Sequence, residues 1–151
     1  MYTECDLIYY ENKQTIVKKD NKVIGNIKFK PKDIINNWCL ENGSSMSGRM
    51  KSARHILNIK QKPPIIISEK RRIILIPTTS CFSIDCIYIQ YKNIEKVKFV
   101  SQGVSKILTK SNKELIIDVD RRVIVKQIKR VEKLLKHLKI ENRVYYVQET
   151  Y

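Results

Sequence analysis

The spacing of apolar and polar residues predicts that the N-terminal part of the chain is a β-meander. Three short runs rich in Ile, Val and Tyr are separated by polar turns, of which Asp20-Asn21 is one. Runs of this length between Asn- and Asp-containing turns are typical of antiparallel strands. Gly25, inside the third run, indicates a β-bulge. The predicted strands cover residues 6–10, 14–19 and 22–29.

Helical spacing of apolar residues begins after the meander. Pro31 suits the first turn of a helix and Asp33 favours its positive end, so a helix is predicted over residues 32–41. We interpret Trp38, the single tryptophan, as a core residue, with base stacking or an interface as the alternative. One face of this helix would be buried, made by Ile34, Ile35, Trp38 and Cys39.

A second, amphipathic helix is predicted over residues 48–58, after a small polar loop that begins at Gly43. Its basic residues would lie towards solvent, and for each of them a merely solvated position is the alternative to a functional one. Its inner side would be made by Met50, Ala53, Ile56 and Leu57.

Apolar runs then predict further strands. Residues 69–72 form a basic turn between two of them, and residues 92–100 fit either a bent strand or one helical turn. The strands are predicted at residues 65–68, 73–76, 86–91, 104–109 and 113–119.

The clearest element is an amphipathic helix over residues 121–139. Its apolar and basic residues both step by four and three, so they lie on opposite faces at 3.6 residues per turn. The basic face is either a soluble surface or a contact for phosphate or an acidic partner. The tail, residues 143–151, could pair as a strand or dock on another subunit. The apolar residues are Ile124, Ile128, Val131, Leu135 and Leu138, and the basic ones are Arg122, Lys126, Lys129, Lys133 and Lys136.

These elements predict an α+β fold in a single domain, residues 1–151. We expect an antiparallel β-sheet with an inserted helical and loop segment, and a C-terminal amphipathic helix packed on the sheet. The strand–strand–helix ending resembles a pleckstrin-homology-like fold, and such an analogy between folds says little about function.

Composition adds a strong positive charge to this picture. The 151 residues are 42% hydrophobic and 30% charged, and Lys and Arg outnumber Asp and Glu by 30 to 15. The net charge of +15 favours binding to a polyanion. No apolar run approaches the roughly 20 residues that span a bilayer, and the N-terminus lacks the pattern of a signal peptide. We therefore expect no membrane association and a cytoplasmic protein.

No motif indicates catalysis. The sequence has no phosphate-binding or dinucleotide-binding glycine motif, and its histidines lie in no recognisable nucleophile motif. The four cysteines form no C-x-x-C pair, so buried thiols are favoured over a metal site or a disulfide. We expect neither an enzyme nor a bound cofactor or metal.

Residues 43–67 combine small, basic and apolar segments in one stretch. A G-S-S-x-x-G-R segment at residues 43–49 precedes K-P-P-I at 62–65, and a strand closing on Pro-Thr follows at 74–78. In order and spacing, these motifs resemble the bacterial competence transcription factor family, ComK. The resemblance is clear over about residues 38–91.

The resemblance implies a transcription activator that binds AT-rich double-stranded DNA through the minor groove. It also implies dimers that pair into tetramers, and it points to RNA polymerase and a Clp protease adaptor as partners. An A-tract has a narrow minor groove with enhanced negative potential, which favours inserted Arg or Lys. We expect Arg49, on a flexible loop and with Lys51 and Arg54 behind it, to reach such a groove, while the prolines hold Lys62 extended.

The candidate DNA-binding residues share positive charge or a hydrogen-bond donor within or near this stretch. A pleckstrin-homology-like module that binds anionic lipid or an acidic protein is the alternative function. An RNA-binding protein is a further alternative, disfavoured because Tyr88 and Tyr91 are not spaced to share one strand face. The candidates are Ser44, Ser45, Arg49, Lys51, Arg54, His55, Lys60, Lys62, Arg71 and Arg72.

Overall fold

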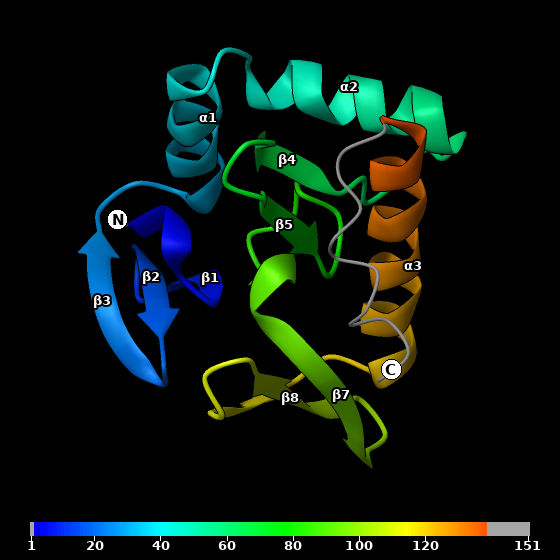
Figure 1. Ribbon diagram of the computed structural model, residues 1–151. Helices are drawn as coiled ribbons and strands as arrows, with labels where there is room; N and C mark the ends of the chain where they lie inside the picture. The colour runs from blue at the N-terminus through cyan, green and yellow to red at the C-terminus, as the bar shows by residue number, and fades with distance from the viewer. Residues whose placement is uncertain (1, 139–151) are drawn as a thin grey trace.

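The predicted meander is one half of a larger antiparallel sheet. In the computed structural model, which describes residues 2–138, β1 pairs on one side with β2 and on the other with β6, giving the strand order β3-β2-β1-β6-β5-β4 (Figure 1). The α+β prediction is confirmed. The strands are β1 (Leu7–Glu11), β2 (Gln14–Lys19), β3 (Lys22–Ile27), β4 (Ile65–Ser68), β5 (Ile73–Pro77) and β6 (Tyr88–Gln90).

The single predicted sheet is in fact two sheets. A 3-10 turn at Tyr91–Asn93 separates β6 from the next strand, so the chain leaves the first sheet there and starts a second one. Residues 92–100 therefore contain both the turn and the strand that the sequence left as alternatives. The second sheet has the order β7-β8-β9, with β7 (Ile94–Ser101), β8 (Val104–Thr109) and β9 (Glu114–Ile117).

The irregularity predicted at Gly25 is present. Val17 pairs with Gly25, but Lys18 pairs with Val23, so Ile24 is the extra residue of a bulge. A Cβ atom on Gly25 would lie 3.1 Å from the Tyr2 ring. Glycine at this position thus permits the close approach of the N-terminal segment.

Helix α1 (Pro31–Glu41) packs on one face of the six-stranded sheet, and α2 (Met46–Leu57) lies along β4 and contributes side chains to the cores on both faces. Trp38 is only 8% exposed and belongs to the core, as predicted. The start of α2 differs from the prediction: the helix begins ahead of Gly48, so the polar loop is shorter than expected. The reason is Ser45, whose Oγ accepts a hydrogen bond from the Gly48 amide at 2.9 Å and caps the helix.

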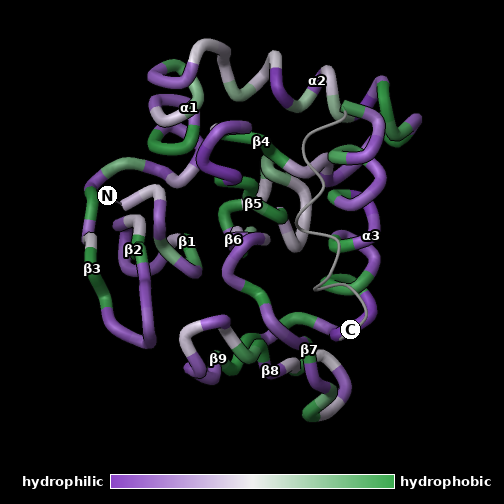
Figure 2. Tube along the Cα trace, in the orientation of Figure 1, coloured by the Kyte–Doolittle hydropathy of each residue, from purple (hydrophilic) through white to green (hydrophobic). Residues whose placement is uncertain are grey.

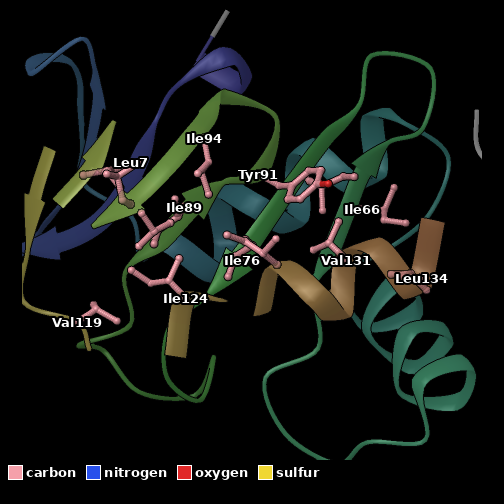
Figure 3. Packing of buried hydrophobic residues seen from close by; sticks show 14 of the residues in the cluster. Leu7, Ile66, Ile76, Ile89, Tyr91, Ile94, Val119, Ile124, Val131 and Leu134 are labelled. Carbon is pink, nitrogen blue, oxygen red and sulfur yellow. The ribbon is translucent and has the colours of Figure 1, made fainter. Parts of the chain in front are cut away.

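Helix α3 (Arg121–His137) packs on the other face and joins the two sheets through one core. Figure 3 shows Ile124 on the side of Ile76 and Ile89, and Leu134 on the side of Ile66. The apolar stripe of α3 faces inward and its polar side faces outward (Figure 2). Of the predicted stripe, Leu138 is 37% exposed and stands outside the core.

The burial of β4 and β5 on both faces of the sheet explains why their sequences are continuously apolar. Ile65 and Ile67 lie in the core that includes the buried face of α1, whereas Ile66 lies in the core under α3. Side chains alternate between the faces of a strand, so a strand covered on both faces needs apolar residues at every position.

Among residues 2–138, none of the helices combines the length and the apolar character needed to span a bilayer.

Candidate nucleic-acid interface

The predicted DNA-binding residues divide into groups, because Arg49 and Arg54 lie about 140° apart around α2 at 3.6 residues per turn. Arg49 belongs to a hollow between α2 and the C-terminal part of α3, together with Ser44 and Glu69. Arg54 belongs to a different hollow, together with Lys60 and Lys62. The structure therefore does not form one continuous site from all ten residues.

Arg49 is engaged within the protein. Its Nη1 donates to Glu69 Oε1 at 3.2 Å and its Nη2 to the carbonyl oxygen of Asn42 at 3.3 Å. The Arg49 side chain is 20% exposed, and its Nε has no hydrogen-bond partner within residues 2–138. Any contact between this guanidinium and DNA would require it to leave Glu69.

The serines of the loop also have structural roles. Ser45 Oγ is occupied as the cap of α2, and Ser44 Oγ donates to the carbonyl oxygen of Ser45 at 3.4 Å. Gly43 has a φ of +98°, which a residue with a Cβ rarely adopts. The side chains of this loop stabilise the turn between α1 and α2, and the two serine hydroxyls are already engaged there.

Arg71 and Arg72 lie in the turn between β4 and β5. Arg71 Nη2 donates to Thr3 Oγ1 at 3.4 Å, and Lys92 Nζ donates to the Arg71 carbonyl oxygen at 3.1 Å. Arg72 has a φ of +58°, and its Nη1 is buried with no hydrogen-bond partner in the part of the chain described. These contacts tie the turn to the N-terminal segment.

Arg54, Lys60 and Lys62 are brought together by the loop that follows α2. Arg54 Nε donates to the carbonyl oxygen of Lys60 at 3.1 Å, and all three residues line one hollow. Lys51 and His55 are exposed on the same helix. The loop thus gathers cations from α2 and from its own residues on an open surface.

The conformation of this loop corrects one prediction: Lys62 is not extended but has a φ of +55°. Helix α3 holds it there. Gln127, only 1% exposed, donates from Nε2 to the carbonyl oxygens of Lys62 at 2.9 Å and Pro77 at 2.7 Å. Arg130 Nη1 donates to the Gln61 carbonyl oxygen at 3.0 Å. Contacts from another element therefore override the local preference of a residue before proline.

The basic face of α3 is exposed, as predicted. Arg130, on the same helix, bonds the carbonyl oxygens of Gln61 and Lys62, so α3 lies next to the loop that carries Lys60 and Lys62. Arg122 is partly neutralised by Asp120, whose Oδ1 lies 3.1 Å from Arg122 Nε. The exposed residues are Arg122, Lys126, Lys129, Lys133 and Lys136. The predicted tail at residues 143–151 lies outside the described residues.

Sequence reasoning missed Lys32 and Phe82, which lie beside Arg54. Lys32 is on α1, and its Nζ is 4.9 Å from the centre of the Phe82 ring. Phe82 lies in the loop between β5 and β6 and is 77% exposed. The available signal was a phenylalanine within a run of small and polar residues, where no core position is expected.

The possible metal ligands of the described residues form no cluster, and their thiols are buried. No cluster of three or more His, Cys, Asp or Glu that could hold a metal occurs among them. The four cysteines are buried and unpaired, and burial raises the pKa of the Cys5 thiol to about 12 and of the Cys39 thiol to about 11. The Cys5 and Cys39 thiols are therefore protonated and weakly nucleophilic at neutral pH.

Comparison with known proteins identifies the family of the chain. A family model described as "ComK protein" matches residues 5–143. The competence transcription factor of Bacillus subtilis (strain 168) is 25% identical over 115 residues, which cover 76% of this chain. The same alignment covers only 59% of the length of that relative. No solved structure matches the chain, so the pleckstrin-homology-like analogy stays a prediction.

Proposed function

The chain belongs to the ComK protein family, and on that premise we propose that it is a competence transcription regulator that binds AT-rich double-stranded DNA through the minor groove. It acts in the cytoplasm at the nucleoid, as a dimer or a dimer of dimers. Its further partners are RNA polymerase and a Clp protease adaptor.

The observation that supports this proposal is the meeting of two basic surfaces. Arg54, Lys60 and Lys62 line one hollow, and Arg130 connects their loop to the basic face of α3. Two adjoining groups of cations suit the phosphate backbone of a duplex, and each neutralised phosphate releases condensed counterions. These cations account for binding to a duplex, but they do not by themselves account for a preference for AT-rich sequences.

Arg54 is the residue of this group best suited to the minor groove. Its Nε donates to the Lys60 carbonyl oxygen, and within residues 2–138 it forms no salt bridge with an acidic residue. The narrow groove of an A-tract attracts such a guanidinium through its enhanced negative potential. Arg49, by contrast, is paired with Glu69 and is the weaker candidate.

Binding of fluorescent duplexes at one fixed salt concentration tests the proposal. The wild-type protein should bind a duplex with A-tracts more tightly than a GC-rich duplex of the same length. Arg54→Ala and Lys60→Ala should each weaken binding, and Arg54→Ala should also reduce the preference for A-tracts. Lys22→Ala removes an equally positive, exposed residue at the start of β3 and should change neither quantity.

Two results would contradict the proposal. Equal affinity of the wild-type protein for AT-rich and GC-rich duplexes would exclude the sequence preference. Flotation with anionic vesicles together with no duplex binding would favour the lipid-binding alternative. Urea unfolding of each variant shows whether a loss of binding reflects a loss of the fold.

A further inference from the structure

Phe82 is more exposed than any other large apolar side chain in residues 2–138, at 77%. A single exposed apolar residue is common and needs no explanation by itself. The position of Phe82 distinguishes it: it lies at the junction of three hollows that share its side chain.

The loop that carries Phe82 is held by hydrogen bonds of its own. The Phe82 amide donates to Ser80 Oγ at 3.3 Å, and the Ser83 amide donates to the Ser80 carbonyl oxygen at 2.9 Å. At the base of the loop, Thr78 and Ile87 exchange hydrogen bonds, both of 3.1 Å. The Phe82 ring therefore lies on an ordered turn. Binding through an ordered turn loses less conformational entropy than binding through a flexible loop.

The surroundings of the ring are strongly cationic. Lys32 Nζ lies 4.9 Å from the ring centre. Asp33 is the one acidic residue lining these three hollows, all of which fall in the described part of the chain. The cations that line them are Lys30, Lys32, Arg54, Lys60 and Lys62.

An apolar ring encircled by cations matches one kind of partner. A duplex groove has phosphates along its two rims and stacked bases between them, so cations suit the rims and an aromatic ring suits the base stack. An acidic peptide would use the cations but would offer the ring no stacked partner. The charge and the ring together therefore favour double-stranded DNA.

We infer that Phe82 is an intercalating wedge that enters a base step of the AT-rich site while Lys32, Arg54 and Lys60 contact the flanking phosphates. This inference rests on the proposed function and deepens it. Proteins that insert apolar side chains from the minor groove partly unstack one step and bend the duplex. Phe82 would then add affinity and bending without adding a phosphate contact.

The test uses duplexes with A-tracts in which successive adenines are replaced by 2-aminopurine, whose fluorescence rises when it unstacks. The wild-type protein should raise the fluorescence at one step and bring the duplex ends closer, as measured by energy transfer. Phe82→Ala should lose both signals and bind about tenfold more weakly, the size expected for one aromatic–base stack. Phe82→Leu keeps an apolar wedge and should retain most of both signals.

Phe99→Ala is the matched control, because Phe99 is 66% exposed and lies on β7 of the second sheet. It should change neither the fluorescence nor the affinity. If Phe82→Ala unstacks and bends the duplex as the wild type does, the wedge is wrong while the proposed function stands. If the wild-type protein binds no duplex, the proposed function fails and the wedge fails with it.

Discussion

Arg130 Nη1 donates to the carbonyl oxygen of Gln61 at 3.0 Å, and this contact joins the C-terminal helix to the basic loop after α2. Gln127, one turn earlier, accepts a hydrogen bond from the same Nη1 at 3.0 Å and donates to Lys62. Burial lowers the pKa of the Arg130 guanidinium, which nevertheless stays charged at any physiological pH. The position of the loop cations thus depends on α3.

Gln127→Leu should destabilise the fold and loosen the loop. The substitution removes the donor to the buried carbonyl oxygen of Pro77 and leaves the Lys62 carbonyl oxygen with Arg130 alone, and an unsatisfied buried group costs about 1–3 kcal/mol. We expect a loss of about 2 kcal/mol in the free energy of unfolding, measured with urea. Lys126→Ala, at the exposed neighbouring position, should cost little. An unchanged free energy for Gln127→Leu would mean that the loop does not need this contact.

Removal of the acid beside Arg49 should strengthen DNA binding. Glu69→Gln removes the ion pair with Arg49 and one negative charge near the basic surface. Because exposed ion pairs are worth about 0.2–1 kcal/mol, the gain in affinity should be at most about fivefold. Glu11→Gln, at the end of β1, removes the same charge elsewhere and serves as the control. Weaker binding by Glu69→Gln alone would show that the pair holds Arg49 in a productive position.

The salt dependence of DNA binding should report the number of phosphates that the loop residues contact. The logarithm of the binding constant falls with the logarithm of salt concentration, by about 0.9 for each phosphate neutralised. Lys60→Ala and Lys62→Gln should each reduce this slope by about 0.9 if each residue contacts one phosphate. Phe82→Ala should leave the slope unchanged. An identical slope in all the lysine variants would exclude them from the phosphate contacts.

The buried cysteines predict a loss of stability at alkaline pH. Burial raises the pKa of Cys5 to about 12 from an ordinary value of 9.0, so the unfolded thiol releases its proton first as pH rises. The stabilisation is fully present below pH 9 and is lost between pH 9 and about 12. Urea unfolding at pH values from about 8 to about 11 should show this decline, and Cys5→Ala should make it shallower. An equally steep decline in Cys5→Ala would assign it to other groups.

Much of the local structure could be predicted from the sequence. The meander, both early helices and the amphipathic C-terminal helix are where the apolar spacing indicated, because periods of 2 and 3.6 residues are local properties of strands and helices. The start of α2 was harder to locate, because Ser45 caps it within a stretch of several small polar residues. The resemblance to the ComK family was also readable from motif order and spacing, and the family match confirms it.

The candidate site could be predicted only in part. The sequence identified the basic stretch but treated its cations as one group, since residues close along the chain were assumed to act together. Their positions on α2 separate Arg49 from Arg54, and packing gives Arg49 a partner in Glu69, 20 residues away. Lys32 and Phe82 were missed because only the folded chain brings α1 and the β5–β6 loop beside Arg54.

The sequence by itself determined the elements, the positive charge and the two basic faces, because each depends on the identity and spacing of neighbouring residues. The tertiary structure decided which cations are free, which are paired and which surround Phe82. It also set the left-handed conformation of Lys62 through contacts from α3, 65 residues away in the chain. Such contacts depend on how the helices pack on the two sheets, and no local pattern encodes them.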